Sequence, residues 1–205
     1  MKRLVFLVFL ASLFVSIYSQ DQVTNAQLKT KNEIGIVSNF GICELSGPRS
    51  HPFIAAAHGK AVFSYGINYV RTLSQKLKLE TGISYSKYTL VNHIINDPDF
   101  NFYATEYFKI ISIPILLRYY FPNDYYISGG TILDLVYARP GGWILSDSQN
   151  GFALSIGAGK EISFSRFSLS IGTNFDLHAA IPFSGDLSQQ KFFVPGFKIG
   201  LNYKL

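Results

Sequence analysis

Hydrophobic and polar residues alternate along most of this chain with a period of two residues. In the segment 167–178, for example, Phe175 and Leu177 belong to an apolar series, while Asn174 and Asp176 belong to the polar series between its members. Successive side chains of a β-strand point to opposite sides, so this period predicts strands with one apolar face and one polar face. The closing segment 193–205 repeats the pattern. We therefore expect an all-β protein.

The pattern predicts about eight strands of about ten residues each. Their expected starts lie near Glu33, Lys60, Lys76, Tyr107, Asp124, Gly151, Phe167 and Phe192. The gaps are alternately long and short: the long ones are 43–59, 89–106, 138–150 and 179–191, and the short ones are 72–75, 122–123 and 163–166. A barrel that inserts from one side of a membrane has this rhythm, because turns on the insertion side stay tight while loops on the far side can grow. The sequence thus predicts an eight-stranded antiparallel up-and-down transmembrane β-barrel with short periplasmic turns and long extracellular loops.

The first residues have the features of a secretory signal peptide. Lys2 and Arg3 precede an apolar run at 4–15, and residues 17–19 form an acceptable cleavage site, so we expect cleavage before Gln20. The apolar run is shorter than the roughly 20 residues that a membrane-spanning helix needs, which argues against the alternative of an N-terminal anchor. The expected organisation is a signal peptide at 1–19, a short periplasmic lead at 20–32 and one outer-membrane barrel domain at 33–205.

Composition narrows the class of protein further. Although 48% of the residues are apolar and 16% are aromatic, no apolar stretch after the first segment is long enough for a spanning helix. Removal of Lys2 and Arg3 lowers the net charge from +5 to +3, and no basic cluster follows. Nucleic acid is therefore not an expected partner. The single cysteine, Cys43, cannot form an internal disulfide.

One hairpin carries a resemblance to a known family. Residues 113–121 read Ile-Pro-Ile-Leu-Leu-Arg-Tyr-Tyr-Phe, and after a tight turn residues 125–130 read Tyr-Tyr-Ile-Ser-Gly-Gly. This resembles the central hairpin of the PorT-like outer-membrane β-barrel proteins of Bacteroidota, and the closing strand is similar too. The resemblance implies an outer-membrane location, with membrane lipid, the barrel-assembly machinery, and envelope or secretion components as partners. This chain differs from the usual pattern in ending on Leu205 instead of an aromatic residue.

The charged residues of the strands fall mainly on the expected inward face. Eight strands leave an interior just wide enough for side chains to fill, and unpaired buried charges are costly, so we expect these groups to pair. Glu80 and Arg118 lie on neighbouring strands at a similar distance from the short turns and form the first expected pair. The expected lumen charge network is Glu80, Arg118, Lys78, Glu161, Asp134, Asp176, His178 and Lys198, with Glu33 and Lys204 on the same face. A conducting or proton-relay path is the alternative to a purely structural network.

Aromatic residues gather at both ends of the expected strands. Tyr and Trp rings favour the headgroup level of a membrane, so we interpret them as two aromatic girdles. The girdle at the short-turn ends comprises Tyr119, Phe121, Tyr125, Phe167 and Tyr203. The girdle at the long-loop ends comprises Phe40, Phe63, Tyr107, Tyr137, Trp143 and Phe152.

Catalytic and metal-binding chemistry has weaker signals. Asp176 and His178 share the inward face and could serve a hydrolase with a nearby serine, but the chain lacks a Gly-x-Ser-x-Gly motif. The acidic loop around Asp97 and Asp99, flanked by Asn96 and Asn101, offers oxygen ligands for calcium, without the glycine and distal glutamate of a helix-loop-helix calcium loop. The spacing of His51 and His58 is a still weaker indication of zinc. We expect no enzyme, no cofactor and no metal.

The expected function is that of a non-enzymatic outer-membrane barrel with a structural, secretion-associated or surface-interaction role. A narrow, porin-like pore is the first alternative, and a lipid-modifying enzyme is the second. A soluble lipocalin-like binder is the third, and it would require the opposite alternation, with apolar residues facing inward.

Overall fold

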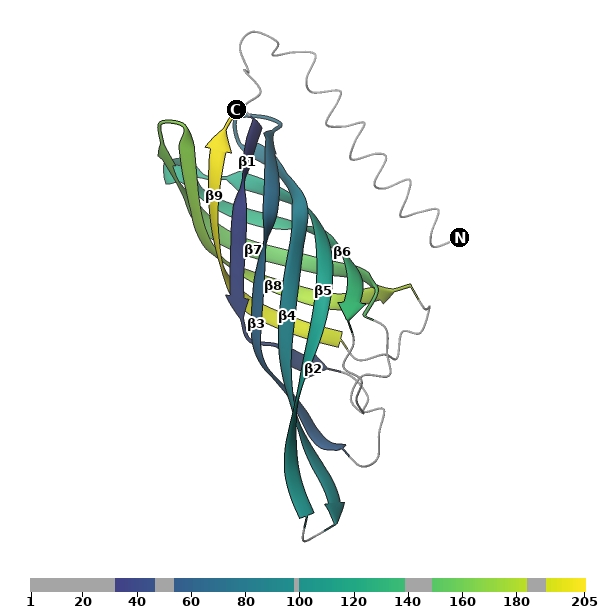
Figure 1. Ribbon diagram of the computed structural model, residues 1–205. Coiled ribbons are helices and arrows are strands. Elements are labelled where there is room, and N and C mark those ends of the chain that lie inside the picture. The colour runs from purple at the N-terminus through teal and green to yellow at the C-terminus, as the bar shows by residue number, and fades with distance from the viewer. Residues whose placement is uncertain (1–31, 47–53, 98–99, 139–148, 184–190) are drawn as a thin grey trace. The chain divides into compact units, whose positions relative to one another are not determined.

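A computed structural model describes residues 32–46, 54–97, 100–138, 149–183 and 191–205 (Figure 1). The regular elements are β1 (Asn32–Gly41), β2 (Glu44–Ser46), β3 (Ile54–Thr72), β4 (Leu77–Asp97), β5 (Phe100–Tyr120), the 3-10 turn η1 (Pro122–Asp124), β6 (Tyr125–Ala138), β7 (Gly151–Phe164), β8 (Phe167–Pro182) and β9 (Lys191–Lys204). In this part of the chain no helix is long and apolar enough to cross a membrane.

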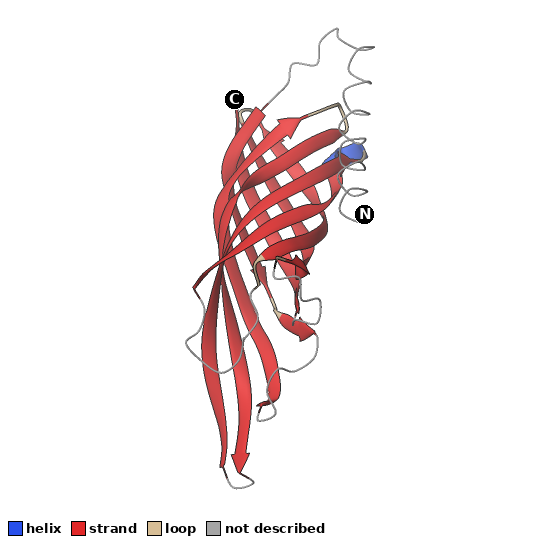
Figure 2. Ribbon diagram, turned by 90° about the vertical axis from the view of Figure 1, so that its right-hand side faces the viewer, coloured by secondary structure: helices blue, strands red, loops and turns tan. Residues whose placement is uncertain are grey.

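The strands form one closed antiparallel sheet (Figures 1 and 2). Each strand from β3 to β8 pairs with the next one along the chain, and β1 pairs with both β3 and β9. The short strand β2 continues β1 after a break, because Gly41 is opposite Gly196 on β9 and Glu44 is opposite Phe193 on the same strand. The barrel therefore has eight strands, and the predicted fold is confirmed.

Three strands are about twice as long as the sequence pattern predicted. β3, β4 and β5 contain 19, 21 and 21 residues, and β4 and β5 stay paired as far as Asp97 and Phe100. The expected long loops at 43–59 and 89–106 are therefore wrong in large part, since much of each segment is strand. β5 pairs with β6 only from Lys109 onward, so β4 and β5 run roughly 30 Å past that rim at about 3.3 Å per residue (Figure 2). Backbone pairing satisfies its own hydrogen bonds and can continue where the apolar-polar alternation fades.

The short turns lie at the end of the barrel that also carries the C-terminus (Figure 1), which we call the turn end; the opposite end is the rim end. In η1, Asn123 and Asp124 have φ values of 65° and 61°. Asn and Asp tolerate this left-handed region better than other non-glycine residues, which permits the tight connection from β5 to β6.

The outer surface of the barrel is apolar and the interior is polar. Ile36, Ile67 and Ile156 are 63%, 56% and 64% exposed, whereas the inward Glu80, Arg118 and Asn68 are each 1% exposed. Glycine and serine occupy many other inward positions, which leaves room for these side chains; a side chain at Gly159, for example, would collide with the Tyr126 ring. The inverted alternation of a soluble lipocalin-like binder is not found in these strands.

Candidate functional site: the barrel lumen

An ion network fills the lumen near the turn end. Glu80 on β4 lies between two cations: Arg118 Nε donates to Oε2 at 2.9 Å, and Lys198 Nζ donates to Oε1 at 2.9 Å. Arg118 Nη2 lies 2.7 Å from the same Oε2 atom. Lys198 reaches Glu80 from β9, a distant strand of the sheet, so this contact crosses the lumen.

Lys78 holds two further carboxylates, one of which, Glu161, lies 3.8 Å from Arg118 Nη1 and so joins them to this network. Its ammonium donates to Glu33 at 2.9 Å and to Glu161 at 2.8 Å. Glu161 also accepts the Tyr120 hydroxyl at 2.5 Å, and Glu33 accepts the Ser168 hydroxyl at 2.6 Å. We call Glu33, Lys78, Glu80, Arg118, Glu161 and Lys198 the inner ion network.

The inner ion network contains equal numbers of carboxylates and cations. Charge-assisted hydrogen bonds connect them, as burial requires. Two tyrosine rings add cation–π contacts, because the Arg118 guanidinium lies 4.9 Å from the Tyr126 ring centroid and Lys78 Nζ lies 4.9 Å from that of Tyr120. The network therefore closes the lumen as a neutral cross-linked layer.

A second polar group, the outer polar cluster, lies nearer the rim end. Its members are Tyr88, Ser112, Asp134, Ser155, Asn174, Asp176 and His178. Asp134 lies 2.6 Å from His178 Nδ1 and accepts the Ser112 hydroxyl at 2.6 Å. On the other side of the imidazole ring, Nε2 lies 2.9 Å from the Tyr88 hydroxyl. The neutral imidazole fits both contacts if Nδ1 donates and Nε2 accepts.

A β-bulge on β8 positions the His178 side chain. The register with β7 shifts between Phe152 and Leu154, and Ala179 has a φ of 53°. His178 and Ala179 are both buried, so the strict alternation breaks here. Bulges insert an extra residue and re-aim the neighbouring side chains. The imidazole ring thereby meets both Asp134 and Tyr88.

Between the outer polar cluster and the rim end, apolar side chains close the lumen. The rings of Tyr88, Phe108 and Phe192 lie with centroids 5.6 to 6.2 Å apart. They form a buried group, the aromatic plug, together with Cys43, Val62, Leu90, Ile110 and Val194. Cys43 lies in the break between β1 and β2, where burial and, secondarily, the charge of Glu44 raise the thiol pKa to about 12. The thiol is thus an apolar filler at neutral pH.

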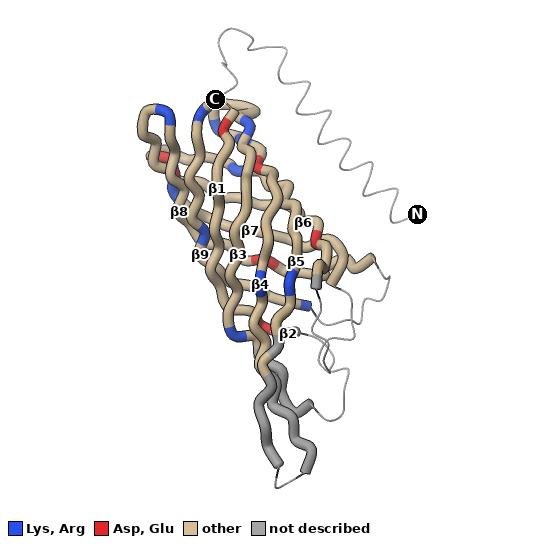
Figure 3. Tube along the Cα trace, viewed as in Figure 1, with Lys and Arg blue, Asp and Glu red and all other residues tan. Residues whose placement is uncertain are grey.

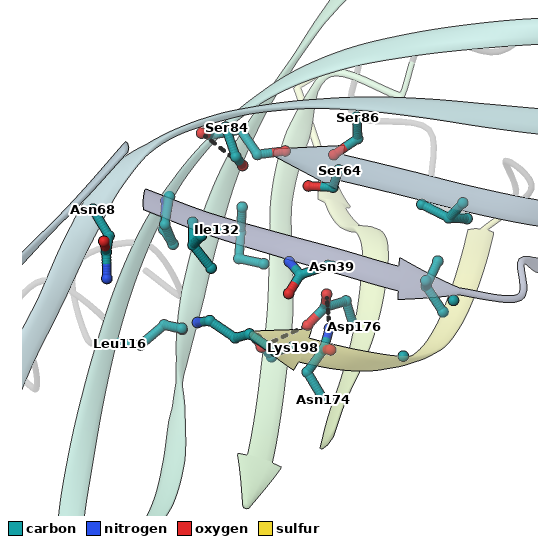
Figure 4. A pocket seen from close by; sticks show the side chains of 18 of the residues that line it. Asn39, Ser64, Asn68, Ser84, Ser86, Leu116, Ile132, Asn174, Asp176 and Lys198 are labelled. Atoms are coloured by element: carbon teal, nitrogen blue, oxygen red, sulfur yellow. Dashed lines mark hydrogen bonds between the residues drawn. The ribbon is translucent and has the colours of Figure 1, made fainter. Parts of the chain in front are cut away.

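Between the two polar layers lies a cavity of about 60 Å³ (Figure 4). Asn39, Asn68 and Asn174 line it with amide atoms that have no protein partner among the described residues. A water needs roughly 10–15 Å³, so the cavity has room for a few waters that would complete these hydrogen bonds. Organic ligands need sites of about 300 Å³ or more. A larger open hollow of about 420 Å³ at the turn end is floored by Lys78 and Glu161.

The structure brings the expected lumen residues into two groups. Glu80, Arg118, Lys78, Glu161 and Lys198 belong to the inner ion network, and Asp134, Asp176 and His178 belong to the outer polar cluster. Lys204 borders the turn-end hollow and has no ion pair among the described residues. Their role as a functional site stays a prediction. Sequence reasoning missed the hydroxyl groups of Tyr88, Tyr120 and Ser168, which alternation placed inward without indicating a partner.

The expected girdle residues that the structure describes are all on the outer surface. They are between 37% and 70% exposed: Phe40, Phe63, Tyr107, Tyr119, Phe121, Tyr125, Tyr137, Phe152, Phe167 and Tyr203. The girdle is still a prediction in its membrane role. Trp143, His51, and the side chains of His58 and of the calcium candidates around Asp97 and Asp99 lie outside the described residues. Elsewhere, the described residues contain no group of three or more metal-binding side chains.

The hydrolase arrangement considered from the sequence needs His178 beside a serine. The hydroxyls of Ser112 and Ser155 instead donate to the carboxylates of Asp134 and Asp176. His178 itself is 3% exposed beneath the aromatic plug. Within the described lumen, no serine hydroxyl is hydrogen-bonded to an imidazole base, as nucleophilic catalysis requires.

Comparison with known proteins supports the fold. No family model and no curated protein matches the chain. Among solved structures, the outer membrane protein OprG from Pseudomonas aeruginosa superposes with a TM-score of 0.55 at 12% identity, covering 86% of this chain and 96% of OprG. Neisserial surface protein A gives a TM-score of 0.48 at 18% identity, with 84% and 97% covered. Ail of Yersinia pestis gives 0.42 at 13% identity, with 85% and 99% covered. The likeness to OprG shows that this chain has the fold of an eight-stranded outer-membrane β-barrel.

Proposed function

We propose that this chain is a non-enzymatic outer-membrane β-barrel protein whose filled lumen does not conduct, and which acts through the surface that it presents outside. The proposal includes export by a cleaved signal peptide at 1–19 and an orientation with the turn end in the periplasm. The observation that carries it is the combination of an apolar outer wall with an interior closed by the inner ion network and the aromatic plug. Lipid suits the wall, and the two layers leave no open path for solutes.

The apolar wall predicts where a charge would be least tolerated. Ile67 on β3 is 56% exposed and lies midway between Phe63, near the rim end, and Arg71, near the turn end. Ile67→Arg should cost about 2–4 kcal/mol of folding stability in lipid vesicles, because the charge would enter the membrane midplane. Gln75→Arg, in an exposed turn, is the matched control and should change little. Urea unfolding from vesicles measures both, and equal stability of the Ile67 variant and the parent would contradict a membrane-facing wall.

The closed lumen separates this proposal from the narrow pore. The purified mature protein should give no resolvable single-channel conductance in planar bilayers, because both lumen layers must move before ions can pass. Steady conductance steps in the parent protein, absent from a matched preparation without it, would favour the pore.

We further propose an association with envelope or secretion components, in keeping with the PorT-like hairpin. The strands β4 and β5 project past the rim formed by β6 (Figure 2) and offer a contact surface outside the lipid. Cross-linking in native outer membranes followed by mass spectrometry tests this association. Recovery of secretion components would support it, whereas recovery of the barrel-assembly machinery alone would favour a purely structural role.

A further inference from the structure

Two lysines face each other on the outer wall, at the level of the rim-end aromatic residues. Cross-strand pairing joins Phe197 to Phe40, Phe40 to Phe63, Phe63 to Lys87, and Lys87 to Lys109. One row around the barrel thus consists of three phenylalanines followed by two lysines. Figure 3 shows the two basic positions side by side on β4 and β5.

This arrangement leaves positive charge uncompensated. Residues directly opposite each other in antiparallel strands have Cβ atoms about 5 Å apart, and like charges there are destabilising. Lys87 Nζ lies 3.9 Å from the Tyr107 ring centroid, which holds the ammonium at the wall. Within the described part of the chain, neither lysine makes an ion pair with a carboxylate, although five such contacts of lysine or arginine occur elsewhere.

We propose that Lys87 and Lys109 bind the phosphate of an anionic lipid headgroup in the leaflet at the rim end. The inference rests on the proposed function, because it requires the wall to lie in a membrane. A phosphate between the two ammonium groups replaces their repulsion with two charge-assisted hydrogen bonds. The neighbouring Phe63 and Tyr107 rings are 44% and 50% exposed and present apolar surface to the acyl chains of the same lipid.

The level of the pair favours a lipid over an acidic protein. The lysines share a row with Phe40 and Phe63, and aromatic residues at the ends of barrel strands mark the headgroup level. An acidic protein segment approaching from the aqueous side would have to enter the headgroup layer to reach them. Lipid phosphates already lie at that level.

Lys160 provides a matched control. It is also an exposed outward lysine, and its Nζ lies 4.9 Å from the Tyr125 ring centroid near the turn end. However, its cross-strand neighbours are Tyr125 and Ile171, so it lacks a second cation. Lys160 thus reports the general attraction of one lysine to an anionic membrane.

The first experiment measures lipid retention. Full-length mature protein is refolded into phosphatidylcholine vesicles that contain labelled phosphatidylglycerol or lipid A, then extracted and assayed for bound lipid. The K87Q/K109Q variant should retain about 25-fold less labelled lipid than the parent, because each lysine of the site contributes about fivefold. K160Q should retain nearly as much lipid as the parent, because a lone lysine does not hold a lipid through extraction. Equal losses in both variants would overturn the proposal. Competition by free inorganic phosphate at equal concentration would also overturn it, in favour of a simple phosphate-ion site.

The second experiment tests a reversal of sign in the folding equilibrium. In phosphatidylcholine alone, each phosphate is already balanced by the choline ammonium of the same headgroup. K109Q should there raise the folding equilibrium constant by up to about fivefold, because the repulsion between the two lysines is relieved. With anionic lipid present it should lower that constant by about fivefold, because half of the phosphate site is lost. K160Q should give no gain in phosphatidylcholine. A K109Q effect of one sign in both membranes would overturn the proposal, whereas failure of the parent to insert into either membrane would overturn the proposed function itself.

Discussion

The two ends of the lumen are closed by opposite means. Near the turn end, the inner ion network holds three carboxylates and three cations in contact. At the rim end, the aromatic plug closes the same interior with rings and aliphatic groups. The network depends on complete pairing, because each buried charge is costly without its partner. The plug has no such requirement, and apart from the Tyr88 hydroxyl its stability depends on packing.

The difference matters because one substitution in the ion network removes several interactions together, whereas one substitution in the plug removes only part of its packing. Removal of one carboxylate leaves its cations buried and unpaired. Removal of one ring leaves a cavity that neighbouring side chains can partly fill. Substitutions at the two ends should therefore differ in size and in how they combine.

The largest effect is expected at Glu80, which serves two cations. Glu80→Ala should lower the free energy of unfolding by about 3–5 kcal/mol, because Arg118 and Lys198 lose their shared partner. Combined with Arg118→Ala, the loss should be smaller than the sum of the two single losses. Urea unfolding of detergent-refolded protein measures this cycle, with the exposed Glu44→Ala as control. Strict additivity would show that the two residues do not act as a pair.

A smaller effect is expected in the aromatic plug. Phe192→Ala should cost about 3 kcal/mol, toward the low end for a buried phenylalanine, because the plug lies at the rim end, where neighbouring side chains can relax. The neighbouring Phe193 faces outward and is 37% exposed, so Phe193→Ala should cost less. The Phe192 variant should also stay non-conducting, because the inner ion network still closes the lumen. Conductance in this variant would identify the plug as the only seal.

The smallest effect is expected at Tyr88, where the aromatic plug meets the outer polar cluster. Tyr88 belongs to the plug through its ring and to the outer polar cluster through its hydroxyl, which lies 2.9 Å from His178 Nε2. Tyr88→Phe keeps the ring and removes the hydrogen bond, so it should cost about 1 kcal/mol. Tyr65→Phe is the control, because Tyr65 lies on the outer wall and is 53% exposed. No difference between the two variants would mean that the hydroxyl contact adds nothing to stability.

The apolar-polar alternation was sufficient to predict the barrel architecture, because each strand of a barrel wall has one apolar outer face and one polar inner face along its length. It indicated the eight strands, their antiparallel order and the inward position of every charged member of the inner ion network. It also placed Glu80 and Arg118 on neighbouring strands, which is enough to expect contact. It failed at the rim-end parts of β3, β4 and β5, where the predicted loops are largely strand. In these segments the apolar-polar alternation fades, although the backbone pairing continues.

Other features arise only when the sheet closes. Lys198 and Glu80 are 118 residues apart in the chain, and they meet because β9 pairs with β1 and completes the barrel. The His178–Asp134 contact depends on the bulge at Ala179, which breaks the period that sequence reasoning relies on. Local alternation determines which face a side chain occupies, because that depends on its own strand. Its partner across the lumen depends on the curvature, stagger and bulges of the whole sheet, which only the tertiary structure decides.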